Sequence, residues 1–477
     1  PELAGVDIVL YDEFHERSLD ADVGLALSLD IQQGLREDLQ ILIMSATLDS
    51  ESLLTVLGPK TPVIESRGKI YPVDTHYRSS RPQEVASEHQ RRVIMEALSA
   101  HTGDLLVFLP GQREIRQLEN ALLSHTGNAT SDNVQVLSLH GRLPLQHQQA
   151  VLNPDSTYQR RIILSTSLAE SSLTVPGVSI VIDAGWERRA EYHPRSGMTR
   201  LITTRVNQAS ADQRRGRAAR TGPGVCYRLW PEESMLSAHR KPEIDCSNLE
   251  SLQFELCRWG VEDASTLPWV TPPPEAAMQA AKQALIRLAL LSEKGTLTPF
   301  GHRCSVWPTS PRLAIILQSA MDALQGETDA AVQSLLTDLA CRLVATLETP
   351  DSIRGEDLSA VTELPGTSGT RQPSLRQWDQ TFQQWRTRFT NEAAKRLSRT
   401  DVRLVDDQQG KNNYQQNARE WLSRLLLSAW PERLAVRRQP GTYQLTTGHQ
   451  IKIHPTHPLG KHPLLVVPVS YTHLTLP

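Results

Sequence analysis

Residues 6–15 read VDIVLYDEFH, and residues 39–47 read LQILIMSAT. Each stretch contains an apolar run that predicts a short β-strand, over Val6–Leu10 and Leu39–Met44. A helical pattern lies between the runs, and strands that alternate with helices predict a parallel sheet. Polar residues follow both runs directly. Because ligands of parallel sheets bind beyond the carboxyl ends of the strands, these polar residues are candidates for a functional site.

The first polar cluster contains an acidic pair. Adjacent carboxylates at a strand end could hold a hydrated Mg²⁺ through Asp12 and activate a water through Glu13, as phosphoryl transfer requires. In the second cluster, the hydroxyls of Ser45 and Thr47 could bond to His15 and couple a nucleotide site to a moving partner. The alternatives are a solvated turn for the acidic pair and a helix N-cap for the hydroxyls.

A second alternation of strands and helices follows the first. A weaker strand is predicted over Pro62–Ile64, and a low-order segment over about Lys69–Glu88 separates the two parts. The strands of the second part are predicted over Leu105–Leu109, Val134–Leu139, Arg161–Leu164, Val178–Ile182 and Val225–Trp230. A turn at Pro110-Gly111 and a helix over Gln112–Leu123 follow the first of them. The pattern predicts a doubly wound α/β domain of roughly 140 residues.

The charge of the chain is uneven along its length. The net charge is −3, yet nine arginines and three acidic residues lie between Trp186 and Arg220, which indicates a confined anion site. Gln213, Arg217 and Arg220 have near-helical spacing and should share one face. Such an arginine pair could reach a γ-phosphate from a second domain. The alternative is a basic, solvated helix.

The segment Ser165–Thr174 follows a predicted strand and is rich in small hydroxyl side chains. A turn of this kind suits a sugar-phosphate backbone, because its hydroxyls and backbone N–H groups can contact phosphates without reading bases. An ordinary helix-capping segment is the alternative.

Composition excludes several classes of protein. At about 150 residues per domain, 477 residues predict about three domains, and 39% hydrophobic residues exclude a largely disordered chain. We find no apolar run near the ~20 residues that span a membrane and no signal-peptide pattern. Five scattered cysteines without a CxxC pair indicate free thiols in a reducing compartment, which predicts a cytoplasmic protein.

Beyond Pro231 the pattern becomes helical. Helices are predicted over Asn248–Trp259, Pro274–Leu291, Pro311–Leu324, Glu327–Leu347 and Trp421–Trp430. The second of these precedes a tight turn and a short wing over residues 292–298. Residues 350–374 are rich in Pro, Gly, Ser and Thr, which is typical of a linker, and Thr442–Ile453 resembles a hairpin.

Five strings, taken in order, resemble the motifs of the DEAH-box branch of superfamily 2 helicases, and the match is closer to the bacterial HrpB-type helicases. They are YDEFHERSLDAD, MSATLD, VFLPGQREI, STSLAESSLTVPGV and QRRGRAART. The string WERRAEYHPRSGMTRL lies between the last two, and LTPFG, SPRLA and RRQPGTYQLTTG extend the resemblance over most of the chain.

The resemblance implies an α/β fold of two RecA-like parallel-sheet lobes, the first one partial, followed by winged-helix, helical-bundle and small mixed C-terminal domains. The implied divisions are a first lobe over 1–70, a linker over 71–90, a second lobe over 91–231, a winged helix over 232–307, a helical bundle over 308–349, a linker over 350–374, and an incomplete C-terminal domain over 375–477.

The resemblance also assigns roles around a nucleotide. Asp12 would hold Mg²⁺ through water, Glu13 would polarise the attacking water, and His15 with Ser45 and Thr47 would link hydrolysis to strand separation. Gln213, Arg217 and Arg220 would contact the γ-phosphate, with both arginines as arginine fingers. Thr174 would contact the ribose.

A second group of residues would contact nucleic acid. The turns that would lie along the strand backbone contain Pro110, Gly111, His140, Gly141 and Thr166. The segment Arg188–Arg205 would include a hairpin that separates strands.

The implied function is an ATP-dependent 3′-to-5′ helicase that uses ATP and Mg²⁺. Its partners would be single strands or tailed duplexes, RNA in preference to DNA, and it would not bind membranes. The phosphate-binding Gly-Lys-Thr/Ser sequence is missing, since Gly-Lys occurs only at Gly68, Gly410 and Gly460 and is followed by Ile, Asn and His. With the first methionine at Met44, we expect an N-terminally truncated chain. The alternatives are an inactive nucleic-acid-binding or partner-docking fragment and an ATPase switch that is independent of nucleic acid.

Overall fold

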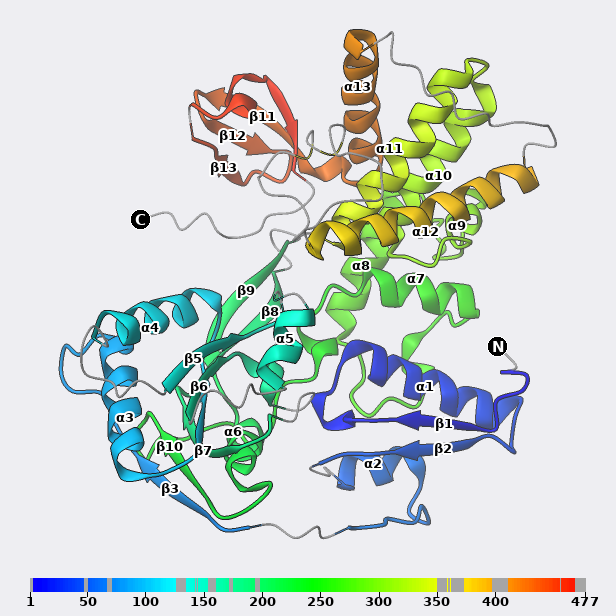
Figure 1. The fold of residues 1–477 in the computed structure, drawn as a ribbon. Helices are drawn as coiled ribbons and strands as arrows, with labels where there is room; N and C mark the ends of the chain where they lie inside the picture. Colours follow the sequence, from blue (N-terminus) through cyan, green and yellow to red (C-terminus); the bar gives the residue numbers. More distant parts are fainter. Residues whose placement is uncertain are drawn as a thin grey trace. The chain divides into compact units, whose positions relative to one another are not determined.

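The computed structural model describes residues 3–46, 50–66, 71–125, 134–141, 143, 145–152, 160–170, 175–193, 198–349, 358, 361, 373–396, 411–454 and 456–467. The chain divides into two units. Figure 1 shows the fold, coloured along the sequence. Unit 1 consists of Pro1–Glu191, Arg200–Ser247 and Leu267–Pro272, and unit 2 consists of Tyr192–Thr199, Asn248–Thr266 and Pro273–Pro477.

Unit 1 begins with a two-stranded parallel sheet. Its elements are β1 (Ile8–Tyr11), α1 (Leu19–Gly34), β2 (Gln40–Ile43) and α2 (Ser50–Leu57). The two predicted strands are thus confirmed, and β1 pairs with β2 in parallel. Helix α1 begins after Ser18, whose side chain accepts a hydrogen bond from the Ala21 amide. The strand predicted over Pro62–Ile64 is wrong, because this segment is irregular and Ile64 is 87% exposed. Proline also lacks the amide that a sheet needs.

A six-stranded parallel sheet forms the larger part of unit 1. Its strands are β3 (Val73–Tyr77), β4 (Asp104–Phe108), β5 (Val134–Leu139), β6 (Arg160–Ser165), β7 (Val178–Asp183) and β10 (Gly224–Arg228). Their order is β3-β10-β7-β4-β6-β5. The accompanying helices are α3 (Ala86–Ala100), α4 (Gln112–His125), α5 (Leu145–Leu152) and α6 (Gln208–Gly216). All five strands predicted for this part are confirmed.

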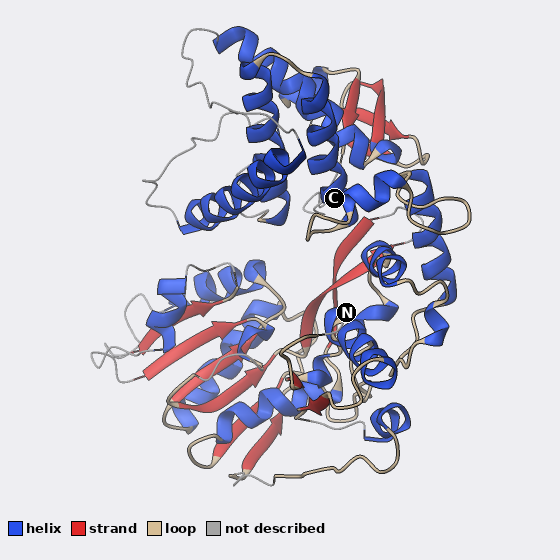
Figure 2. Cartoon of the chain, turned by 90° about the vertical axis from the view of Figure 1, so that its right-hand side faces the viewer, coloured by secondary structure: helices blue, strands red, loops and turns tan. Residues whose placement is uncertain are grey.

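Helices cover both faces of this sheet (Figure 2). In β4, Leu105 and Val107 pack with α3 and α4, whereas Leu106 and Phe108 pack with Val151 of α5 on the other face. Alternate residues of a strand point to opposite faces, so a strand covered on both sides must be apolar throughout. The continuous apolar runs of the sequence follow from this arrangement.

The first strand of the six lies in the segment predicted as a linker. Residues 71–90 contain β3 and the beginning of α3, which corrects that expectation. β3 reads VDTHY and pairs in parallel with β10 alone, at the edge of the sheet. An edge strand needs no continuous apolar run, so this strand lacks the pattern by which its neighbours were predicted.

A separate two-stranded ribbon is formed by β8 (Trp186–His193) and β9 (Met198–Arg205). It occupies the segment in which the resemblance predicted a hairpin. The residues joining the two strands lie outside the described ranges.

Unit 2 is mainly helical. Its helices are α7 (Glu250–Trp259), α8 (Glu275–Arg287), α9 (Pro299–Cys304), α10 (Pro311–Gly326), α11 (Ala330–Glu348), α12 (Pro373–Arg396) and α13 (Lys411–Ala429). They share one core that includes Phe254, Leu317, Val344 and Phe389. Helix α11 is long and apolar enough to cross a membrane, but 56% of its apolar window is buried, as expected of a core helix. A β-bridge between Leu291 and Leu297 closes the predicted wing.

A four-stranded antiparallel sheet follows the helices of unit 2. Its strands are β11 (Leu434–Gln439), β12 (Thr442–Leu445), β13 (Gln450–Lys452) and β14 (Leu464–Val466), in the order β13-β12-β11-β14. The predicted hairpin is confirmed as β12 and β13. Helix α12 and strands β11 and β14 were not predicted.

Candidate functional site

The acidic pair lies in a sharp turn at the end of β1. Glu13 has φ 50° and Arg17 has φ 51°, and a 3₁₀ turn over Phe14–Glu16 lies between them. Left-handed conformations cost a residue with a Cβ about 1–2 kcal/mol, so the surrounding structure must enforce them. Asp12 is exposed, and one of its carboxylate oxygens accepts the Glu13 amide at 2.8 Å.

His15 connects the acidic pair with two other segments. Its Nδ1 lies 3.5 Å from the Glu13 carboxylate and accepts the Ala46 amide at 3.3 Å. Its Nε2 lies 2.5 Å from the side-chain nitrogen of Gln213. The structure therefore brings His15 to the loop after β2, where its partner is the Ala46 amide, and also to Gln213. That loop contains Ser45, whereas Thr47 lies outside the described residues.

The two predicted arginine fingers follow α6. The α-helix ends at Gly216, and Arg217 begins a 3₁₀ turn that precedes Arg220, so the near-helical spacing runs from an α-helix into a 3₁₀ turn. Burial, with the neighbouring Arg220, lowers the pKa of Arg217 to about 10, whereas Glu13 and Glu170 act in the opposite direction. Burial also lowers the pKa of Arg220, and Glu13 again opposes it. Glu13 therefore lies close enough to both arginines to favour their charged forms.

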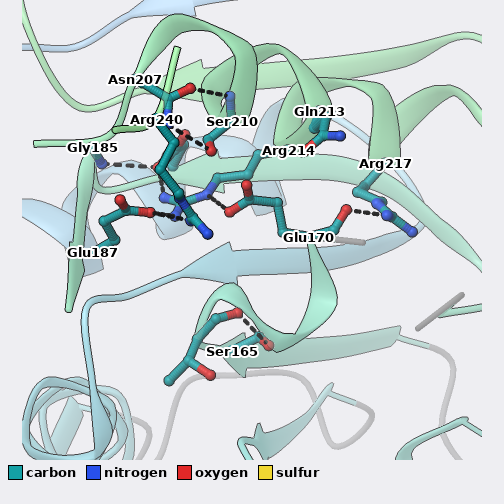
Figure 3. Close-up of polar contacts among 12 residues, drawn as sticks. Ser165, Glu170, Gly185, Glu187, Asn207, Ser210, Gln213, Arg214, Arg217 and Arg240 are labelled. Carbon is teal, nitrogen blue, oxygen red and sulfur yellow. Dashed lines mark hydrogen bonds and ion pairs between the residues drawn. The ribbon is translucent and has the colours of Figure 1, made fainter. Parts of the chain in front are cut away.

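Arg214 lies between Gln213 and Arg217 in the sequence, but its side chain is only 1% exposed (Figure 3). Its guanidinium donates to Glu170 at 3.0 Å and to Asp183 at 2.9 Å, and it lies 3.7 Å from the carboxylate of Glu187. Burial alone would lower the pKa of Arg214, but the attraction of Asp183 and Glu170 raises it overall. The solvated-helix alternative is therefore wrong for this residue.

Sequence reasoning did not single out Arg214, although the sequence carried a signal. Ala211, Arg214 and Ala218 are spaced three and four residues apart, and both alanines are buried. This spacing defines the inward face of the helix, on which an arginine must find carboxylate partners.

A cavity of ≈ 290 Å³ adjoins these groups within unit 1. Its lining includes His15, Ser45, Glu170 and Gln213, together with Arg240. Four of the five therefore belong to motifs that the sequence singled out, and Arg240 does not.

The predicted nucleic-acid contacts lie at one edge of the six-stranded sheet. β4, β6 and β5 are neighbours, and their carboxyl ends lead into the turns that carry Gly111, Thr166 and His140. Gln112 and His140 are joined at 3.1 Å, and the Thr166 amide donates to the Leu139 carbonyl at 3.3 Å. These turns are thus brought together. Thr174 lies outside the described residues.

A basic side chain borders the same turns. A Cβ added at Gly111 would lie 2.8 Å from the guanidinium of Arg188, so Arg188 packs closely over the backbone of this turn. Arg188 also donates to Glu114 at 3.2 Å. Pro110 and Gly141 are the remaining turn residues, and Gly141 is exposed.

The donor set near Glu13 fits a hydrated magnesium ion better than a fully protein-bound metal. Within the described ranges, no group of three or more His, Cys, Asp or Glu side chains could hold a metal ion. Mg²⁺ keeps several waters and is typically held by one or two carboxylates and substrate phosphates. The exposed Asp12 carboxylate meets that requirement.

Comparison with known proteins gives three kinds of match. Residues 89–222 match the family described as "Helicase conserved C-terminal domain". The chain is 37% identical over 473 residues to the ATP-dependent RNA helicase HrpB of Escherichia coli, covering 98% of this chain and 52% of that protein. It is 34% identical over 334 residues to the pre-mRNA-splicing factor ATP-dependent RNA helicase prp22 of Schizosaccharomyces pombe, covering 68% of this chain and 28% of that protein.

Two solved structures are similar over nearly the whole chain. The crystal structure of the E. coli DExH-box NTPase HrpB gives a TM-score of 0.79 at 34% identity and covers 100% of this chain and 53% of that one. The crystal structure of the Escherichia coli DEAH/RHA helicase HrpB gives a TM-score of 0.80 at 34% identity, with 98% and 54% covered. The chain spans about half the length of these relatives.

The parallel sheet and these matches define the class, which is that of the helicases. Within this class, the chain belongs to the DEAH-box family, in its HrpB-type branch. The resemblance inferred from the five motifs is confirmed.

Proposed function

We propose that the whole protein is an ATP-dependent helicase that couples ATP hydrolysis to the unwinding of nucleic acid, with RNA preferred to DNA and 3′-to-5′ polarity. Support comes from the relatives, because HrpB and prp22 are both named ATP-dependent RNA helicases. The scattered free cysteines support a cytoplasmic location.

The observation that carries the proposal is that His15, which lies 3.5 Å from the Glu13 carboxylate, meets Gln213 of the arginine segment at 2.5 Å. Glu13 also favours the charged forms of Arg217 and Arg220. A triphosphate between these groups would place its γ-phosphate beside the two guanidiniums and an attacking water beside Glu13. The guanidiniums would stabilise the negative charge of the transition state, and the Glu13 carboxylate would orient and polarise the water. Asp12 would hold Mg²⁺, which neutralises phosphate charge when bound.

His15 and Gln213 would transmit a change in the bound nucleotide to the segment after β2. Their side chains meet at 2.5 Å, and His15 also lies beside Glu13 and the loop of Ser45. A change at the phosphate would therefore reach the segment after β2 through one imidazole ring. We assign the coupling role to His15 and Ser45, and Thr47 keeps the same predicted role outside the described residues.

The substitution Glu13→Gln in the whole protein tests this assignment. We expect ATP turnover to fall about 10²–10⁴-fold, the usual contribution of a positioned general base, while ATP still binds. Steady-state turnover and equilibrium binding of a fluorescent ATP analogue measure the two effects. The exposed Glu37, changed to Gln, serves as a control that should retain turnover. Normal hydrolysis by the Glu13 variant would refute the role.

A second candidate function concerns residues 1–477 taken alone, because none of their Gly-Lys pairs is followed by Thr or Ser. We propose that this chain binds single strands along the β4–β6–β5 edge without hydrolysing ATP. Fluorescence anisotropy with a labelled single strand and an ATPase assay on the purified chain distinguish the two activities. Turnover by the chain itself would contradict this second proposal.

A further inference from the structure

An ion-pair network joins Arg214 to the base of the β8–β9 ribbon. One carboxylate oxygen of Glu187, the second residue of β8, lies 3.7 Å from Arg214 and accepts a hydrogen bond from Arg240 at 2.9 Å. Figure 3 shows Glu187 and Arg240 beside Arg214. One acidic group thus serves two arginines from different segments of unit 1.

The Arg214–Glu187 pair is buried, whereas the side chain of Arg240 is 31% exposed. Glu187 is 5% exposed and Arg214 is 1% exposed on their side chains. Separating Arg214 from Glu187 would weaken the ionic compensation of both groups in a medium of low polarity, which is unfavourable. A displacement of Arg214 therefore favours a displacement of Glu187.

The other end of the network reaches a proposed arginine finger. The Glu170 carboxylate accepts from Arg214 at 3.0 Å, and the Glu170 main-chain carbonyl accepts from Arg217. A movement of Arg217 towards a phosphate would change its contact with Glu170, and Glu170 holds Arg214 directly.

The strand that carries Glu187 also faces the nucleic-acid edge. Successive residues of a strand point to opposite sides, so Arg188 points away from the buried network. It packs against Gly111 and donates to Glu114 at 3.2 Å, beside the turn after β4. A shift of β8 that starts at Glu187 must therefore move Arg188 relative to this turn.

We propose that Glu187 and Arg240 are positioning residues that couple the arginine segment Arg214–Arg220 to the nucleic-acid edge through β8. The inference rests on the proposed helicase function. It adds that the signal passes through the Glu187–Arg240 ion pair, and that Glu187 itself touches neither the nucleotide nor the strand.

The experiment compares Glu187→Gln, Arg240→Gln and the double variant in the whole protein. Glutamine preserves the size of the glutamate side chain and removes its charge. We expect the stimulation of ATP turnover by single-stranded RNA to fall about fivefold in each variant, the lower end of typical coupling between sites. Turnover without RNA and KM for ATP should stay within about twofold, because the phosphate contacts remain.

Three features of the data distinguish coupling from a merely structural role. The double variant should lose no more stimulation than either single variant, since both remove the same ion pair, and Arg240→Lys should restore most of it. Glu255→Gln removes an exposed i,i+3 pair with Arg258 on α7 and is the matched control. Unchanged stimulation, or an equal loss of turnover with and without RNA, would overturn the proposal.

A measurement on the chain itself separates this inference from the proposed function. If the whole protein shows no stimulation by RNA, the helicase proposal fails. Amide hydrogen exchange in the chain then tests the coupling through the ion-pair network separately. We expect Glu187→Gln to accelerate amide exchange about fivefold in α6 and at Gly111–Glu114 as well as in β8. Acceleration confined to the immediate neighbours of Glu187 would refute the coupling, whatever the activity of the whole protein.

Discussion

At the scale of the residue, Arg217 lies in surroundings that disfavour its own charge. Burial and the adjacent Arg220 lower the pKa of Arg217 to about 10, although Glu13 and Glu170 favour the charged form. An anion beside Arg217 would shift this balance towards the charged form. Function and stability therefore make opposite demands on this position, as is common where a site is built for a ligand.

Arg217→Gln should separate the two demands. We expect ATP turnover of the whole protein to fall about 10³–10⁵-fold, the usual contribution of an arginine finger. The thermal midpoint of the chain should stay unchanged or rise, because a disfavoured charge is removed. Arg215, whose side chain is 43% exposed, gives the control Arg215→Gln, for which neither quantity should change. A variant that retains turnover within tenfold, or that unfolds at a clearly lower temperature, would contradict this reasoning.

Motif residues could be predicted individually, but their partners could not. The sequence indicated Glu13, His15 and Gln213 separately, and the structure adds that His15 contacts both of the others. Glu187 and Arg240 had no local signal, because an ion pair between residues more than fifty positions apart depends on the tertiary fold. Only the apolar spacing around Arg214 indicated that a charge would have to be buried.

At the scale of the element, the packing of β10 against the 3₁₀ turn after α6 positions the arginines. A Cβ at Gly224 would lie 2.2 Å from the Ala218 carbonyl oxygen and 2.6 Å from its carbon. The turn that contains Arg217 therefore rests directly on the backbone of β10. The sequence predicted the strand from its apolar run, but nothing in that run indicated why its first residue is glycine.

Gly224→Ala should force this turn away from the sheet. Overpacking of this kind typically costs about 1–3 kcal/mol, and we expect a loss of stability in that range, measured by denaturant unfolding of the chain. ATP turnover of the whole protein should fall as well, because Arg217 moves with the turn. Gly222 lies two residues earlier, and an added Cβ there would meet nothing within 4 Å. Gly222→Ala should therefore stay within about 0.5 kcal/mol, and equal effects of the two substitutions would rule out the packing argument.

The sequence predicted the buried strands of the six-stranded sheet but not one of its edge strands or one of the helices. Strands β4, β6, β7 and β10 lie inside the sheet and are buried on both faces, and their apolar runs predicted them. Edge strand β3 has no such run, and helix α12 was missed although its aromatic residues Trp378, Phe382 and Phe389 are buried in the core of unit 2. Both omissions arise where a mixed sequence is stabilised by tertiary contacts.

At the scale of the whole molecule, the β1–β2 sheet has an uncovered face. Ile8, Leu10 and Leu42 are 50%, 59% and 48% exposed, whereas the alternate residues of both strands are half-buried. Parallel sheets are normally covered on both faces, and adjoining exposed apolar side chains mark an interaction surface. Since the chain spans about half of its relatives, we expect further structure of the whole protein to cover this face.

Leu10→Lys tests whether that face is covered. In the chain alone, lysine replaces an exposed leucine, so stability should change by less than about 0.5 kcal/mol and binding of an apolar dye should weaken. In the whole protein, the same lysine would be buried without a partner, and unfolding should require at least about 2 kcal/mol less free energy. Leu35 is 61% exposed and lies just beyond α1, outside this sheet face, so Leu35→Lys should have little effect in either context. If Leu10→Lys is equally mild in both, the face is open in the whole protein, and the β1–β2 sheet is not completed by further strands or helices against that side.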